Sequence, residues 1–218
     1  RQERIDSIMS GQLSTNFFRE VELSSVANTR ESQTVTNKTF RRSLGGQYYV
    51  LRLISKPLER ADADTLFAFL ASQDGKFDSF TIIPPIISNT KGTASGTITV
   101  DNAEVVETET GGVALSKSAG SRAVGITNSS ETGTLKTGDK IKFSNHDKVY
   151  VLTADINLDG SSVNALQFYP ALTTAVTSST TVVYENVPFK VRLQDDVIKE
   201  TISTDGLYSI EISVREDT

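Results

Sequence analysis

The fold is decided by residues 47–83, which read QYYVLRLISKPLERADADTLFAFLASQDGKFDSFTII. Residues 47–54 are aromatic and branched-aliphatic, and they lie between two glycines and Pro57, which is typical of a β-strand. Residues 77–83 are a second such run, and they stop at Pro84 and Pro85. The stretch between them has helical periodicity, so we expect a strand–helix–strand unit whose helix lies across a sheet.

The helix is predicted over Leu58–Gln73. Ala63, Leu66, Phe67 and Leu70 recur at intervals of three and four, which places them on one stripe of a helix. Asp62 and Asp64 lie near its start, where the helix dipole favours anions, and Gly75 supplies a left-handed residue after its end. We expect the Leu66, Phe67 and Leu70 side to face the sheet.

Further along the chain, short strands alternate with turn signals. Residues 88–130 are rich in Gly, Ser and Thr, with a strand at 96–100, and we expect loops or edge strands there rather than core. Four short strands follow at regular spacing, 139–143, 148–153, 165–169 and 180–184, and they indicate a small barrel or sandwich. After Asn186, residues 189–193 and 207–214 alternate apolar and polar side chains with period two, as strands do when they bury one face.

The predicted fold class is therefore mainly β. We expect a β-sandwich or barrel core domain with one amphipathic helix, made of residues 44–90 and 186–218. Residues 91–185 are predicted to form an inserted small β-barrel or β-sandwich domain, and residues 1–43 an N-terminal arm. The arm has strand-forming runs but too few apolar residues for a core of its own, so we expect it to contact other subunits.

Composition excludes several kinds of site. The chain of 218 residues has 22 Lys and Arg against 27 Asp and Glu, a net charge of −5, which disfavours sequence-independent nucleic-acid binding and a polybasic membrane surface. It has no cysteine and one histidine, which excludes disulfides, thiolate nucleophiles and histidine clusters. The 51 Ser and Thr residues favour strands and turns. The sequence has no apolar run long enough to predict a membrane helix.

A calcium motif is broken. Residues 155–160, DINLDG, match the opening of an EF-hand loop, but the twelfth position is Leu166 where a carboxylate is required, and the flanks are predicted strands. The same residues suit a hairpin turn, which we prefer.

Candidate catalytic groups have simpler interpretations. His146 lies beside Asp147 in a polar tetrapeptide between two strands, which favours a turn over a general base. Ser95 among glycines lacks the G-x-S-x-G order of a nucleophile elbow. Carboxylate pairs such as Asp195-Asp196 are expected on a solvated face. Arg41-Arg42 are expected on a solvated face too, or in a salt bridge between subunits. We therefore predict no catalytic, cofactor-binding or metal-binding residues and no cofactor, and we expect that the protein is not an enzyme.

Three stretches carry a resemblance to a known family. The run from Gly45 through the predicted helix to Pro85 resembles tailed-bacteriophage distal tail proteins, also called tail hub proteins. Residues 135–143, 149–155 and 169–172 are similar to the inserted segment of that family, and residues 187–193 and 202–208 to its C-terminal return. The resemblance spans about residues 44–215 and lies in strand and turn positions.

The resemblance implies a homo-oligomeric ring, commonly hexameric, that joins the tail tube to the tail tip or baseplate. It implies a virion protein, assembled in the host cytoplasm, with no specific nucleic-acid binding and no membrane insertion.

Two alternatives belong to other classes. One is a carbohydrate-binding module of a tail tip, if Tyr150, Phe168 and Tyr169 are exposed in a groove. The other is a carboxylate-dependent hydrolase, if two acidic side chains converge in a pocket.

Overall fold

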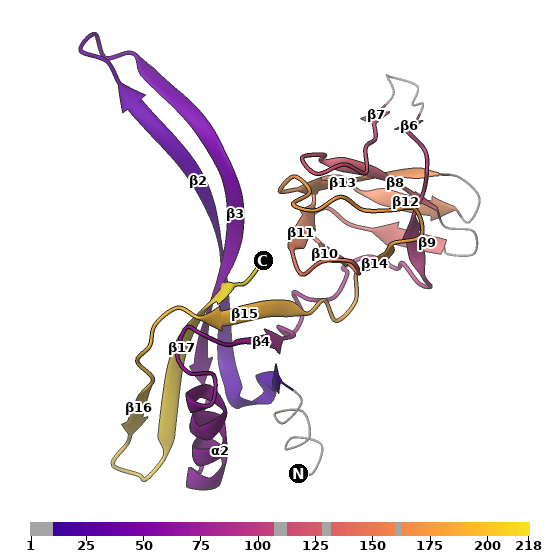
Figure 1. Cartoon of the computed structure of the whole chain (residues 1–218). Coiled ribbons are helices and arrows are strands. Elements are labelled where there is room, and N and C mark those ends of the chain that lie inside the picture. Colours follow the sequence, from indigo (N-terminus) through magenta and orange to yellow (C-terminus); the bar gives the residue numbers. More distant parts are fainter. Residues whose placement is uncertain (1–10, 107–112, 128–131, 160–162) are drawn as a thin grey trace. The chain divides into compact units, whose positions relative to one another are not determined.

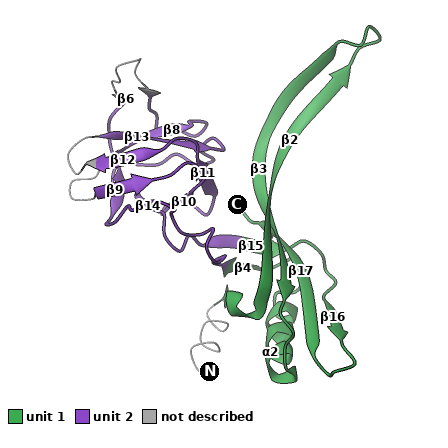
Figure 2. Cartoon of the chain, turned by 180° about the vertical axis from the view of Figure 1, so that it is seen from behind, with its two compact units in different colours: residues 1–81, 191–217 green, residues 82–190, 218 purple. Residues whose placement is uncertain are grey.

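The computed structural model describes residues 11–106, 113–127, 132–159 and 163–218. The described chain is mainly β with the single α-helix α2 (Arg60–Ala71), which confirms the predicted fold class (Figure 1). It divides into two compact units, residues 1–81 with 191–217 and residues 82–190 (Figure 2).

Unit 1 is built on one sheet with the strand order β1-β4-β15-β17-β3-β2, in which β16 also pairs with β17. The elements are β1 (Gln12–Leu13), the 3-10 turn η1 (Thr15–Phe17), β2 (Phe18–Gln33), β3 (Thr39–Ser55), β4 (Ser79–Ile82), β15 (Phe189–Leu193), β16 (Lys199–Ile202) and β17 (Tyr208–Glu216). The predicted strands at 47–54, 189–193 and 207–214 are thus neighbours in one sheet.

The core of unit 1 lies between this sheet and α2. Strands β3 and β17 are antiparallel, with Leu51 opposite Val214 and Leu53 opposite Ile212. These four side chains are at most 5% exposed, and alternation along both strands sends the residues between them to the open face.

The buried face of the helix differs from the predicted one at one position. Ala63, Leu66 and Leu70 are fully buried as expected, but Phe67 is 38% exposed and Phe69 is buried in its place. Phe69 packs edge-on against Phe80 of β4, with ring centroids 5.4 Å apart and planes at 84°. The prediction for Phe67 was wrong because its position lies at the margin of the stripe, and the aromatic partner on β4 selects Phe69.

Residues 11–26 are integrated into the sheet and core of unit 1. Strand β2 pairs with β3 from Phe18 opposite Ser55 to Gln33 opposite Thr39, and Leu13 and Phe17 are 1% and 2% exposed. Removing this whole region would therefore take core side chains away together with any contact surface.

The far half of the β2–β3 hairpin projects from the unit without a core. We call residues 27–46 the ribbon, because every side chain in this range is exposed and the two strands have only each other as neighbours. At its root, register shifts occur on either side of Asn28, opposite Gly45. Gly45 and Gly46 have φ of 71° and 68°, a left-handed conformation that glycine adopts without a side-chain clash.

Unit 2 contains a closed barrel with the order β10-β11-β13-β8-β5-β14, in which β14 pairs with β10. Its strands are β5 (Ile98–Val100), β8 (Ala123–Thr127), β10 (Lys140–Phe143), β11 (Val149–Leu152), β13 (Asn164–Tyr169) and β14 (Thr181–Val183). Two further pairs are β9 (Thr132–Leu135) with β12 (Ile156–Asp159) and β6 (Val105–Val106) with β7 (Val113–Ala114).

The chain enters and leaves unit 2 along adjacent paths. The Val187 N–H donates to the Ser88 carbonyl at 3.0 Å, and the Asn186 N–H donates to the Asn89 side-chain oxygen at 2.8 Å. The ends of the predicted insertion, residues 91–185, thus lie close together. That this segment is a removable domain stays a prediction.

Replacing Leu70 by Ala is expected to lower the free energy of unfolding by about 2 to 5 kcal/mol, because Leu70 is fully buried and a cavity would remain. Phe67→Ala is the matched control and should cost much less, since its side chain is partly in solvent. Urea unfolding of both variants tests the assignment, and equal losses would contradict it.

Replacing residues 91–185 by a short Gly/Ser linker is expected to leave unit 1 folded. Strands β4 and β15 on the two sides are neighbours in the sheet, and the hydrogen bonds of Val187 and Asn186 to Ser88 and Asn89 already hold the joined ends together. Circular dichroism and a cooperative thermal transition are the measurements. A shortened chain without such a transition would show that unit 1 depends on the segment removed.

Candidate functional site

The broken calcium motif is mostly strand. Residues 156–159 form β12 and pair with β9, so the predicted hairpin turn was wrong at these positions. The Asp155 carboxylate accepts hydrogen bonds from the backbone N–H and the hydroxyl of Thr137, both at 2.8 Å, and from Lys136 at 2.9 Å. These donors hold the pKa of Asp155 well below its usual range. Among the described residues no group of three or more His, Cys, Asp or Glu side chains could hold a metal ion.

His146 lies in a turn, as predicted, and it bonds to Tyr150 rather than to Asp147. The Asn145 amide group donates to the Ala175 carbonyl at 2.9 Å, which directs its oxygen toward His146 Nδ1, 2.7 Å away. Nδ1 therefore carries the proton, and Nε2 accepts from the Tyr150 hydroxyl at 2.7 Å. The Asp147 carboxylate instead accepts hydrogen bonds from the ammonium groups of Lys142 and Lys190, at 2.7 and 3.1 Å. The imidazole is a structural group that ties the turn to the barrel.

The aromatic residues proposed for carbohydrate binding are not arranged in a groove. Tyr150 and Phe168 are 0% and 1% exposed, and their rings contact each other and Phe143 in the barrel core. Tyr169 is only partly exposed and lies under the Arg122 guanidinium, 5.8 Å from its ring centre. The condition for that alternative is not met.

The glycines around Ser95 have a packing role. A Cβ atom at Gly92 would lie 1.8 Å from the Thr134 carbonyl oxygen, because the loop approaches β9 closely enough for the Thr93 and Ala94 N–H groups to bind that carbonyl. No helix follows Ser95 in the described structure, which agrees with the rejection of a nucleophile elbow.

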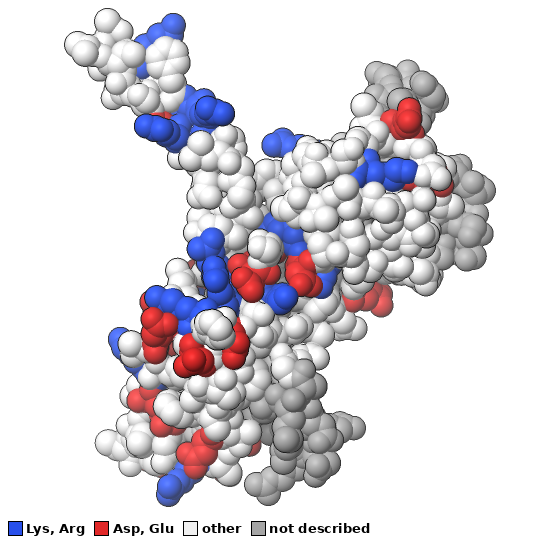
Figure 3. All heavy atoms as spheres, in the orientation of Figure 1, with Lys and Arg blue, Asp and Glu red and all other residues white. Residues whose placement is uncertain are grey.

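The ribbon has two chemically different faces. Residues directly opposite on paired strands share a face, so Phe40 lies with Ser32 and Arg42 with Arg30. The other face carries Arg41, which binds Glu31 at 3.2 Å. We call the side with Phe40, Arg42 and Arg30 the basic face. Figure 3 shows Lys and Arg side chains gathered along the ribbon.

Arg30 and Arg42 are opposite each other without a counter-charge. Neither has an ion-pair partner among the described residues. Like charges directly opposite on a sheet repel, so this pair does not stabilise the isolated ribbon. From the sequence, Arg41-Arg42 were expected on a solvated face or in a salt bridge between subunits, whereas the pairing of Arg42 with Arg30 follows only from the strand register.

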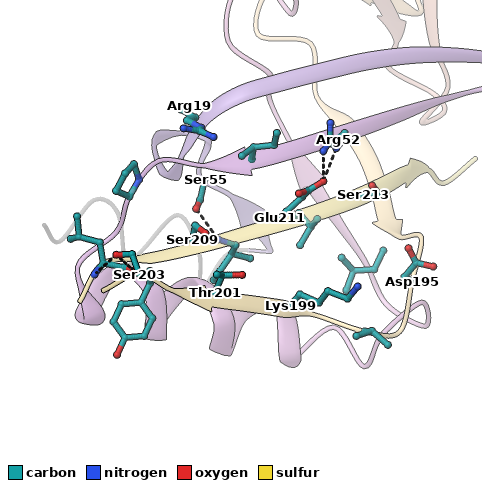
Figure 4. Close-up of a pocket in the computed structure, with 18 of the residues that line it drawn as sticks. Arg19, Arg52, Ser55, Asp195, Lys199, Thr201, Ser203, Ser209, Glu211 and Ser213 are labelled. Atoms are coloured by element: carbon teal, nitrogen blue, oxygen red, sulfur yellow. Dashed lines mark hydrogen bonds and ion pairs between the residues drawn. The ribbon is translucent and has the colours of Figure 1, made fainter. Parts of the chain in front are cut away.

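A groove of about 1310 Å³ lies at the other end of unit 1, over the end of β3 and the first residues of β17 and along β16 (Figure 4). Its acidic lining residues are Asp195, Asp196, Asp205 and Glu211, and its basic ones are Arg19, Arg52, Lys76 and Lys199.

Half of these charges are neutralised within the groove. Arg52 lies 2.6 Å from Glu211, and Lys76 lies 3.6 Å from Asp196. Asp195 and Asp205 have no ion-pair partner among the described residues. Because two of the four carboxylates are already paired with cations, the groove gives the hydrolase alternative no specific support.

A membrane helix is also not found: within the described ranges, no helix is both long and apolar enough to cross a bilayer. The described structure is thus that of a mainly β protein with a closed barrel, a projecting ribbon and a groove lined by charges.

Comparison with known proteins indicates a family for this mainly β protein. Residues 103–187, which include most of the barrel, match the family described as "Distal tail protein pb9, B domain". The chain is also 35% identical over 99 residues to distal tail protein pb9 of Escherichia phage T5, which covers 44% of this chain and 48% of that protein. The chain thus spans about half the length of this relative. Both matches support a phage distal tail family and confirm the resemblance that the sequence shows.

The stability of the protein is expected to fall as pH drops below 6.5, in part through His146. Burial and the charge of Lys142 lower the pKa of His146, so the unfolded chain binds this proton more readily than the folded chain. His146→Gln should therefore lose less stability between pH 7 and pH 5 than the parent. Urea unfolding at both pH values, with an NMR titration of the single imidazole, measures this. A pKa of His146 above 6.5 in the folded protein would contradict the expected direction of the shift, and with it the expected loss of stability at low pH.

Proposed function

We propose that this protein is a structural component of a phage tail that assembles into a ring, commonly hexameric in the family it resembles. The ring connects the tail tube to the tail tip or baseplate, and these proteins are its partners besides further copies of itself. We further propose that it assembles in the host cytoplasm, that it binds no nucleic acid specifically and inserts into no membrane, and that it has no catalytic role. The similarity to pb9 over residues 103–187 supports the place in the tail.

The observation that carries the self-association is the ribbon. An isolated two-stranded hairpin is at best marginally stable in water, and the ribbon has twenty consecutive exposed residues with no core beneath them. Val35, Phe40 and Leu44 are 104%, 55% and 60% exposed in this range. A contact surface on another subunit would cover such side chains and hold the two strands in one conformation.

The sheet of unit 1 also offers unpaired edges. Among the described strands, β2 pairs only with β3 and β16 only with β17, so each leaves one edge free. A free edge is a template for pairing with another chain, and charged residues along it restrict that pairing to suitable partners. Strand β16 has Lys199 and Glu200 at such an edge.

The full chain is expected to form discrete oligomers in solution. Mass photometry across a concentration series gives the subunit number, and negative-stain images show whether the oligomer is a closed ring. A chain that stays monomeric from nanomolar to high micromolar concentration would contradict the proposal. Hydrolysis of a tail-associated glycan, lost on mutating a groove carboxylate, would contradict the non-catalytic part.

A further inference from the structure

We propose that the ribbon turns on a hinge at its root, formed by Asn28 of β2 and by Gly45 and Gly46 of β3. The part beyond the hinge, residues 29–43, moves as one body, and we call it the outer ribbon. Figure 1 shows β2 and β3 running out of the sheet of unit 1 into this projection. The inference goes beyond the proposed function, because it concerns the single chain and does not depend on how copies associate.

Packing from the core of unit 1 ends just before the hinge. Gln47 is 6% exposed, and its amide group donates to the Ser25 hydroxyl at 2.8 Å, whereas every residue in 27–46 is exposed. Among the described strands, β2 and β3 have only each other as neighbours along the ribbon. The direction of the ribbon is therefore set by the backbone at its root rather than by packed side chains.

The ladder between the two strands is interrupted at this root. Regular pairing ends with Val26 opposite Tyr48 and resumes with Thr29 opposite Ser43. Between these two pairs β2 has two residues and β3 has four, so β3 carries two surplus residues. The register contains a single pair among these six residues. Because a surplus residue disrupts the ladder and bends its strand, two of them so close together weaken the link between ribbon and core.

Two glycines make the root adaptable. Gly45 and Gly46 both have left-handed φ, and a Cβ atom at Gly45 would meet nothing within 4 Å. At Gly46 a Cβ atom would lie 3.4 Å from the Asn28 amide nitrogen. Glycine exchanges between left-handed and extended conformations without a side-chain clash, so neighbouring atoms do not confine this backbone. The Asn28 amide group donates to the Gly46 carbonyl at 3.3 Å, an exposed bond that holds the root weakly.

The outer ribbon, in contrast, is held together along its length. Residues 29–33 pair with residues 39–43 without a register shift. At the tip, the Thr34 N–H donates to the Lys38 carbonyl at 3.0 Å and closes the turn. A change of direction is therefore concentrated at the root, which lies between a continuous ladder and the packed core. Hinges of this kind consist of a few residues that absorb the change in φ and ψ.

The hinge separates the direction of the ribbon from the composition of its faces. Arg30 and Arg42 lie beyond the root, where the register is fixed, so they stay opposite each other in every direction of the ribbon. The basic face is thus presented unchanged, and the core does not repack when the ribbon turns.

The experiment measures distances in the full chain. The chain has no cysteine, so spin labels can be placed at chosen exposed sites. Val35→Cys with Ala68→Cys joins the tip of the ribbon to α2, whereas Val35→Cys with Thr29→Cys lies within the outer ribbon and Ser24→Cys with Ala68→Cys within the core. Double electron–electron resonance gives the width of each distance distribution. We expect the ribbon-to-core distribution to be about twice as wide as the other two.

Deletion of Gly45 and Gly46 removes the hinge and keeps the ribbon. Because the deletion takes away both surplus residues, the ladder becomes continuous, and each residue of the outer ribbon stays on its present face. The width of the ribbon-to-core distribution should fall about twofold, to that of the two control pairs, whose own widths should not change. Thermal melts show that each variant is folded.

The measurement uses unassembled chain, isolated by size exclusion. A ribbon-to-core distribution no wider than the controls in the parent, or a width that the deletion leaves unchanged, would overturn the hinge. An equally wide distribution within the outer ribbon would assign the motion to separation of its two strands and would overturn it too. None of these results bears on ring formation, and a chain that forms no oligomer would contradict the proposed function while leaving the hinge in place.

Discussion

The pairing of β3 with β17 is the contact on which the rest of unit 1 depends. It joins residues 50–54 to residues 211–215, which are far apart in the sequence, and it brings Leu51, Leu53, Ile212 and Val214 onto one buried face. The same strand β3 continues out of the core into the ribbon. Because side chains alternate along a strand, the register fixed in the core determines which ribbon residues share a face, apart from the correction introduced by the bulge at Asn28.

Much of this core could be predicted from the sequence. Residues 47–54, 189–193 and 207–214 alternate or cluster apolar side chains strongly enough that local pattern and tertiary structure agree. The outer half of β3 could not be found in this way. Residues 39–46 contain Arg41-Arg42 and Gly45-Gly46, which are typical of a loop, and they are extended because β2 pairs with them rather than because they are buried. Phe69 was missed for a related reason, since its partner Phe80 lies on another strand.

The candidate surfaces were harder to predict than the fold. Sequence patterns report neighbours along the chain, whereas the groove collects side chains from Arg19 to Ser213. Local patterns also misled at residues 156–159, where a motif suited to a turn is a strand held by β9. His146 was placed correctly in a turn, but its fixed tautomer follows from Ala175, which lies outside the local sequence.

A protein that must stay soluble before it assembles cannot present large apolar surfaces. Contiguous exposed apolar patches lead to indiscriminate association, so a specific contact is better encoded in charges that are unfavourable until the partner arrives. The Arg30–Arg42 pair has the first part of this property, since two like charges lie directly opposite each other and repel within one ribbon. The acidic net charge acts in the same direction, because copies repel one another in most orientations. Charge placement thus limits which surfaces can meet, and under the proposed self-assembly the exposed ribbon is the part of unit 1 that most needs a contact surface on another subunit.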